Sequence, residues 1–266
     1  MKSVEPFYFG RTESLLLGCY HSPEIQAHRD CAVVLCYPMG HEYIQFHRAC
    51  RQLAALLAQT GFPVLRFDFY GCGDSSGDCE EGRIHRWLDD VASAVSEIRR
   101  RCNATKICLV GLRLGASLAM MAGAEREHTI DGMVLWDPVV SGKSYLEELQ
   151  SLHQEMLRRA HLRLASDEKR LERVGFVLTG EMIRDLTQLD LLSIQRRPAR
   201  NMLVVESHKK ASERYLIEHL KRLNASVKYL HLPHTQFWAW MEDFSHILVP
   251  PAILNAVMGW LSEPYA

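Results

Sequence analysis

The chain has 266 residues, of which 47% are hydrophobic and 24% are charged, so it is long and apolar enough for a folded core and is not disordered. Lys and Arg together number 31 and Asp and Glu number 32, which gives a formal net charge of −1. A chain without excess positive charge is not expected to bind nucleic acid. No apolar run is long enough for a membrane helix and no signal-peptide pattern is present, so we expect a cytoplasmic protein.

The eight cysteines form no CxxC motif and no His/Cys pattern with zinc-site spacing. We therefore expect reduced thiols, no metal and no cofactor. Cys31, Cys36 and Cys108 lie in apolar runs, where buried free thiols are common.

Apolar runs and helix-spaced apolar residues alternate along most of the chain. The runs predict strands over residues 6–10, 14–22, 31–38, 63–70, 106–112, 131–140, 201–207 and 226–233. The helical spacing predicts helices over residues 43–57, 88–98, 114–124, 212–223 and 253–261. This alternation predicts an α/β protein with a mostly parallel eight-stranded sheet covered by helices.

The alternation stops in the middle of the chain. Residues 143–195 are charged, helical in pattern and free of strand signals. We interpret this segment as a small helical cap inserted into a core made of residues 1–142 and 196–266.

Two glycine-rich turns follow predicted strands, where ligands bind in open parallel sheets. The first, DFYGCGDSSG (68–77), has the form D-x-x-G-x-G-x-S. The second, GLRLG (111–115), has the position and spacing of a nucleophile elbow, G-x-S-x-G, between a strand and a helix. Arg113 occupies the nucleophile position, and a guanidinium stays protonated, so the ordinary serine mechanism is excluded there.

These motifs resemble the α/β-hydrolases of the serine-aminopeptidase-like (S33) group, and more narrowly the exosortase A system-associated hydrolase 2 proteins. The matching segments are residues 37–48, LRFDFYGCGDSSGD, VGLRLGASLA and LWDPVVSGKSYLEEL. The resemblance implies the α/β-hydrolase fold, a bacterial biosynthetic setting and arginine as a regular feature of the elbow. It also implies an oxyanion hole formed by the N–H of Leu114 and that of Met39 or Gly40.

Arg113 has two interpretations. At a helix N-terminus, its guanidinium can bind a carboxylate or an acyl oxyanion. Alternatively, it forms a salt bridge with a nearby acid, for which Asp137 and Glu206 are the candidates.

The resemblance places a catalytic acid after the strand at 201–207 and a histidine after the last strand. Glu206 and His234 fit these places, with Asp137 and His246 as alternatives. Trp238 lies in the same loop as His234 and can line an acyl pocket or seal the last helix.

A relocated nucleophile is a further alternative. Cys72 and Ser75 both lie in the first glycine-rich turn, and a thiol beside Arg113 would have a lowered pKa.

Three functions remain open at this point. The first is an enzyme that acts on an acyl, ester, thioester or carboxylate substrate through Arg113 and a histidine. The second is an inactive pseudo-hydrolase that binds an anionic ligand or a protein, and the third is an esterase or thioesterase that uses Cys72 or Ser75. Basic residues of the cap suggest docking of an acidic acyl carrier protein, and a homodimer is a further candidate assembly.

Overall fold

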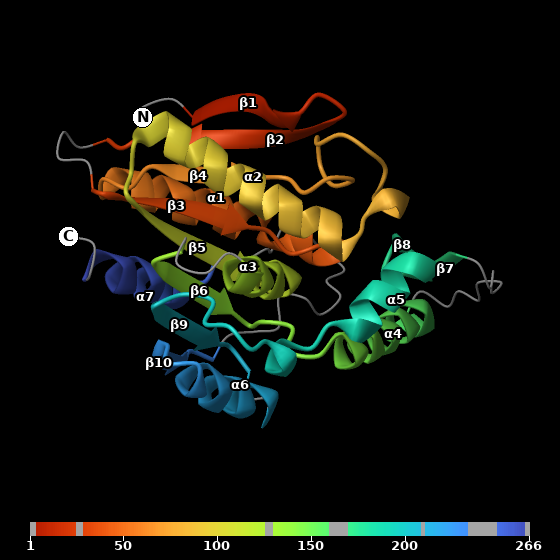
Figure 1. Cartoon of the computed structure of the whole chain (residues 1–266). Coiled ribbons are helices and arrows are strands. Elements are labelled where there is room, and N and C mark those ends of the chain that lie inside the picture. Colours follow the sequence, from red (N-terminus) through yellow and green to blue (C-terminus); the bar gives the residue numbers. More distant parts are fainter. Residues whose placement is uncertain are drawn as a thin grey trace.

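The computed structural model describes residues 4–24, 29–125, 130–159, 170–208, 211–233 and 249–263. Eight strands form one sheet in the order β1-β2-β4-β3-β5-β6-β9-β10 (Figure 1). Their bounds are β1 Val4–Arg11, β2 Ser14–His21, β3 Cys31–Cys36, β4 Val64–Phe67, β5 Lys106–Leu112, β6 Gly132–Trp136, β9 Asn201–Glu206 and β10 Ser226–His231.

All eight predicted strands are therefore present in this sheet. β2 pairs antiparallel with β1 and with β4, and the six strands from β4 to β10 are parallel. This mixed order, with crossover helices between the parallel strands, is the α/β-hydrolase fold, and the predicted fold class is confirmed.

Helices cover both faces of the sheet. On one face lie α2 (Ile84–Cys102), α3 (Leu114–Glu125) and α6 (Ala211–Arg222). On the other lie α1 (His41–Gln59) and α7 (Pro251–Ser262). Because both faces are covered, β3, β4 and β6 are buried along their whole length, and Cys31, Cys36 and Cys108 are fully buried as predicted.

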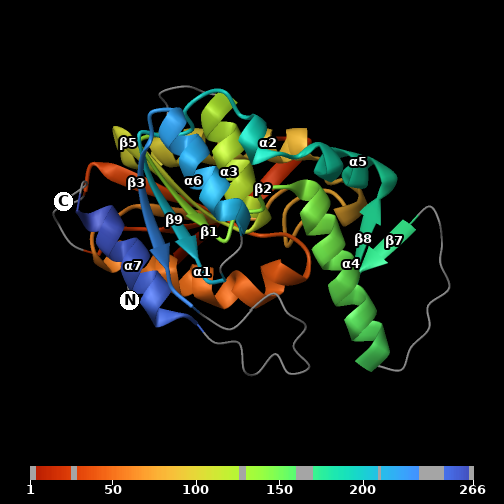
Figure 2. The ribbon, with the colours of Figure 1, turned by 90° about the horizontal axis from the view of Figure 1, so that it is seen from below.

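Between β6 and β9 the chain leaves the sheet. It forms α4 (Gly142–Arg159), a hairpin of β7 (Arg170–Arg173) and β8 (Phe176–Thr179), then α5 (Gly180–Gln188) and a short 3-10 helix, Leu191–Ser193. We call the segment from α4 to α5 the cap. It lies beside one end of the sheet, where Figure 2 shows α4, α5 and the hairpin together.

The hairpin corrects the expectation of an all-helical cap. Its two-residue turn is Val174-Gly175, and both residues have positive φ, 50° and 83°. Such a turn matches the twist of a hairpin, but it normally carries Asn-Gly or Gly-Gly. With valine at the first position and only four residues in each strand, the sequence carried no recognisable hairpin signal.

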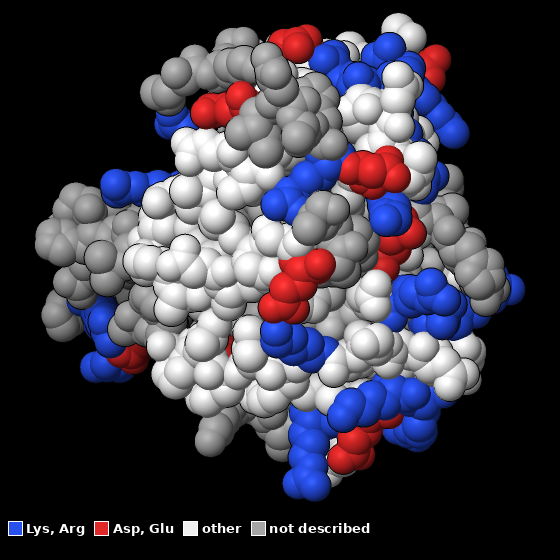
Figure 3. Space-filling view, turned by 90° about the vertical axis from the view of Figure 1, so that its left-hand side faces the viewer, with Lys and Arg blue, Asp and Glu red and all other residues white. Residues whose placement is uncertain are grey.

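Basic and acidic side chains are interspersed on the side of the molecule away from the cap, as Figure 3 shows. Among the described residues, no helix combines the length and apolar character that a membrane span requires.

Candidate functional site

The nucleophile elbow is intact in its backbone. Arg113 lies between β5 and α3 with φ 51°, the left-handed conformation that a sharp strand-to-helix turn imposes on its central residue. The flanking glycines are required by close contacts. A Cβ on Gly111 would lie 2.4 Å from Ala116 Cα, and one on Gly115 would lie 2.2 Å from the carbonyl oxygen of Tyr37. The fold therefore retains a hydrolase elbow but presents arginine at its apex.

The Arg113 side chain is 2% exposed and forms ion pairs with two acids of the described structure. Its Nε donates to Glu42 Oε1 at 2.6 Å, and Nη2 donates to Glu148 Oε1 at 2.7 Å. The Tyr145 hydroxyl donates to the second oxygen of Glu42 at 3.0 Å. Glu42 belongs to α1, whereas Tyr145 and Glu148 belong to α4, so this cluster connects the elbow to the core and to the cap.

Opposing effects act on the Arg113 guanidinium. Burial lowers its pKa, but the carboxylates of Glu42 and Glu148 outweigh burial and hold the pKa above its ordinary value. The arginine is therefore permanently charged and is paired with two carboxylates among the described residues. This geometry favours the salt-bridge interpretation of Arg113, but among the described residues its acids are Glu42 and Glu148 instead of the expected Asp137 or Glu206.

Asp137 follows β6 directly and Glu206 is the last residue of β9, and both are buried. The Asp137 carboxylate accepts hydrogen bonds from the backbone N–H and the hydroxyl of Ser207, at 2.8 and 2.7 Å. Burial raises the pKa of Asp137, while Ser207 and the charge of Arg113 act in the opposite direction. Glu206 accepts a hydrogen bond from the Tyr229 hydroxyl.

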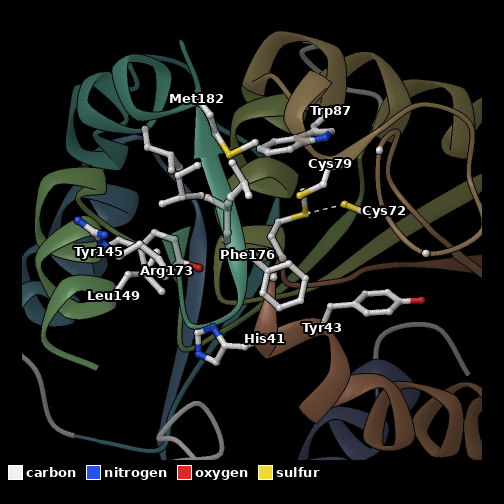
Figure 4. Close-up of a pocket in the computed structure, with 18 residues that line it drawn as sticks. His41, Tyr43, Cys72, Cys79, Trp87, Tyr145, Leu149, Arg173, Phe176 and Met182 are labelled. Carbon is white, nitrogen blue, oxygen red and sulfur yellow. Dashed lines mark hydrogen bonds between the residues drawn. The ribbon is translucent and has the colours of Figure 1, made fainter. Parts of the chain in front are cut away.

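A pocket of about 260 Å³ opens at the carboxyl ends of β3, β4 and β5, beneath the cap (Figure 4). It contains the three residues predicted for the oxyanion hole, Met39, Gly40 and Leu114. Most of its wall is apolar. The described residues that line it are Met39, Gly40, His41, Tyr43, Gly71, Cys72, Gly73, Cys79, Trp87, Leu114, Tyr145, Leu149, Arg173, Phe176, Val177, Leu178, Met182 and Leu186.

The cap forms the roof of this pocket. The Phe176 ring lies 3.6 Å from where a Cβ of Gly40 would be, so the hairpin packs directly over the predicted oxyanion loop. Leu149 of α4 and Met182 of α5 complete the apolar roof. Arg113 is not among the described residues that line the pocket, because its side chain is held in the ion-pair cluster.

Cys72 and Ser75 have different environments. Cys72 lines the pocket, and its thiol lies 3.8 Å from the sulfur of Met39. Burial raises the pKa of the Cys72 thiol well above its ordinary value, which corrects the expectation of a lowered pKa beside Arg113. The Ser75 hydroxyl donates to the carbonyl oxygen of Asp68 at 2.6 Å and accepts from the N–H of Leu17 at 2.9 Å, so it braces the glycine-rich turn.

Three predicted site residues, His234, Trp238 and His246, lie outside the described residues. In contrast, the structure places at the site further residues that the sequence motifs do not indicate. His41 follows Gly40 directly and lines the pocket, and Arg173 lines it from the hairpin. Glu42 and Glu148 hold Arg113, and only the position of Glu42, two residues beyond Gly40, could have signalled its role.

A family model described as serine aminopeptidase, S33, matches residues 28–213 of the chain. Human mitochondrial palmitoyl-protein thioesterase ABHD10 is 28% identical over 100 residues, which is 38% of this chain and 29% of that protein. The matched segment thus spans less than a third of this curated relative.

Solved structures share the fold at low sequence identity. Est1E from Butyrivibrio proteoclasticus, with bound ferulic acid, superposes with a TM-score of 0.69 at 17% identity, covering 97% of this chain and 98% of that one. Mouse α/β-hydrolase domain-containing protein 10 superposes with a TM-score of 0.60 at 15% identity, covering 97% of each chain.

Proposed function

The chain belongs to the serine aminopeptidase (S33) family, and from this premise we propose that it hydrolyses an acyl ester or thioester without forming a serine acyl-enzyme. The observation that supports this most directly is the apolar pocket, which contains Met39, Gly40 and Leu114 and is roofed by the cap. An apolar pocket with a few polar groups at one end suits an acyl chain with a single reactive carbonyl.

The carbonyl oxygen of the substrate would accept hydrogen bonds from the N–H of Leu114 and that of Met39 or Gly40. Leu114 is the first residue of α3, where backbone N–H groups have no partner within the helix and the helix dipole favours negative charge. These donors would stabilise the tetrahedral oxyanion that forms when water attacks the carbonyl carbon.

A histidine would take the proton from that water and return it to the departing alcohol or thiol. His234, with Glu206 orienting it, is the assignment that the resemblance implies. His41 is a second candidate, because it lines the pocket beside Gly40. We assign Arg113 to positioning the elbow, since two carboxylates already balance its charge.

The test is turnover of a panel of aryl esters and acyl thioesters by the wild type and by single His→Gln variants. We expect His234→Gln or His41→Gln to lower kcat/KM by about a hundredfold, the usual contribution of a general base. His85, which is exposed and does not line this pocket, provides the matched control His85→Gln. Normal turnover in both test variants would contradict the acid/base assignment.

A second function is favoured by one observation, the ion-paired arginine at the nucleophile position. A catalytically silent protein with this pocket would bind an acyl compound and release it unchanged. Micromolar binding of an acyl thioester with no product thiol over many hours would establish this function in place of hydrolysis.

A further inference from the structure

Arg173, the last residue of β7, is the one permanently charged side chain among the described residues that line the pocket. Its guanidinium donates to the carbonyl oxygen of the neighbouring Glu172 at 2.8 Å. It forms no ion pair with any carboxylate of the residues that the structure describes. The pocket therefore carries a positive charge that these residues do not neutralise.

The other arginines of the cap whose side chains the structure describes each form an ion pair with an acid. Arg158 and Arg159 both pair with Glu155, at 2.6 and 2.7 Å, and Arg184 pairs with Glu181 at 3.5 Å. Burial alone lowers the pKa of Arg173, with no carboxylate acting against it. Placing an arginine against an apolar pocket without an acid costs free energy, and a bound anion would offset that cost.

The rest of the pocket wall does not supply a counter-charge. Burial is the largest effect on the thiols of Cys72 and Cys79 and on the hydroxyls of Tyr43 and Tyr145, and it raises each pKa. All four groups are therefore neutral near pH 7. His41, the remaining titratable group among the described lining residues, can only add positive charge.

The hairpin holds Arg173 close to the predicted reaction centre. Arg173 pairs across the hairpin with Phe176, whose ring covers Gly40. The adjoining turn is fixed on α4, because the N–H of Val174 donates to His153 Nδ1 at 3.2 Å and Val174 is 3% exposed. The strand that carries Arg173 is thus anchored both to α4 and over the oxyanion loop.

We propose that the pocket selects acyl compounds that carry an anionic group, a carboxylate or a phosphate, and that Arg173 binds this group. A guanidinium forms short, charge-assisted hydrogen bonds with either anion. This inference rests on the proposed function for the acyl part of the ligand and adds the charge that the ligand must carry. The anion can lie at the far end of the acyl chain or on the leaving group.

Binding of non-hydrolysable matched pairs, measured by calorimetry, tests the proposal without requiring turnover. Suberic acid monoamide and suberamide differ only by a carboxylate at the end of an acyl chain. S-octyl-4′-phosphopantetheine and S-octyl-pantetheine differ only by a phosphate on the leaving-group side. We expect the wild type to bind the charged member of at least one pair about tenfold or more tightly, as one charge-assisted contact provides.

Arg173→Gln should remove this preference while leaving the affinity for the neutral member unchanged, and Arg173→Lys should retain part of it. Arg184→Gln, a charge-matched change on the exposed part of the cap, should leave the preference intact. If the neutral members bind as tightly as the charged ones, or if Arg173→Gln keeps the preference, the role of Arg173 is overturned but the acyl pocket stands. If none of the four probes binds, the acyl pocket itself is overturned, and the role of Arg173 with it.

Discussion

The elbow and the hairpin both contribute residues to the wall of the same pocket, and each carries one arginine, but the surroundings of these arginines give them opposite roles. Arg113 is 2% exposed and forms ion pairs with Glu42 and Glu148. Arg173 lines the pocket. Within the described structure, its guanidinium donates a hydrogen bond to a backbone carbonyl oxygen and to no carboxylate. A positive charge is available to a ligand only where the protein has not already neutralised it. The arginine at the catalytic position is therefore the less suited of the two to bind substrate.

The largest loss of unfolding free energy is expected when the charge of Arg113 at the elbow is removed. Arg113→Ala leaves Glu42 buried without its cation, and breaking a buried pair in this way costs about 3–5 kcal/mol of unfolding free energy. Urea denaturation monitored by fluorescence would measure this loss. The double variant Glu42→Gln/Arg113→Met replaces the arginine and the buried acid together. It should recover much of the lost unfolding free energy, because position 42 then carries no unpaired charge.

The two acids that hold Arg113 should differ in the same assay. The Glu42 side chain is 1% exposed and that of Glu148 is 28% exposed. Glu148→Gln should therefore be less destabilising than Glu42→Gln, since water screens the pair at the cap more strongly. Equal losses for the two variants, or a stable Arg113→Ala, would contradict the assignment of Arg113 to a structural ion pair.

A smaller loss of stability is expected at the turn of the hairpin when the pH is lowered. His153 Nδ1 accepts the N–H of Val174, so protonation of this nitrogen abolishes the bond. Burial lowers the pKa of His153, Arg173 lowers it further, and Glu172 raises it. Because the folded pKa lies below the ordinary value of 6.5, this contribution, about 1 kcal/mol, is complete above pH 6.5. It is lost as the pH falls through the folded pKa.

Hydrogen exchange of the Val174 amide, corrected for its intrinsic pH dependence, would follow this loss between pH 7.5 and 4.5. The Met182 amide provides the matched control in the same cap, because it bonds to the hydroxyl of Thr179, which does not titrate in this range. Parallel behaviour of the two amides would show that His153 does not hold the hairpin.

The smallest effect on stability is expected at Arg173. Arg173→Gln removes a charge that has no acid partner in the described structure, so the unfolding free energy should change by no more than about 0.5 kcal/mol. Urea denaturation alongside Arg113→Ala makes the contrast between the two arginines quantitative. A loss of several kcal/mol at Arg173 would show that it, too, is a structural residue.

The fold could be predicted because its signals are local. Buried strands are unbroken apolar runs, such as residues 31–36, and the elbow is a short motif at a strand-to-helix junction. The hairpin could not be predicted, because Val174 adopts a left-handed conformation that valine rarely takes. A valine at this position of the sequence therefore does not indicate a turn.

The candidate site was predictable only in part, since its decisive contacts join distant segments. Met39, Gly40 and Leu114 were expected near the pocket and do line it. The partners of Arg113 lie 71 and 35 residues away from it, in α1 and in α4, and their side-chain directions depend on how the cap packs. The raised pKa of Cys72 likewise reflects burial, which no spacing of residues reveals.

Under the proposed function, this elbow works without a covalent acyl-enzyme, because its apex is an ion-paired arginine. The most direct test is the intact mass of the protein, recorded while it turns over an acyl thioester under single-turnover conditions. Product thiol should accumulate while the protein mass stays unchanged. A transient gain of one acyl group, mapped to Cys72 or to a serine, would contradict the account.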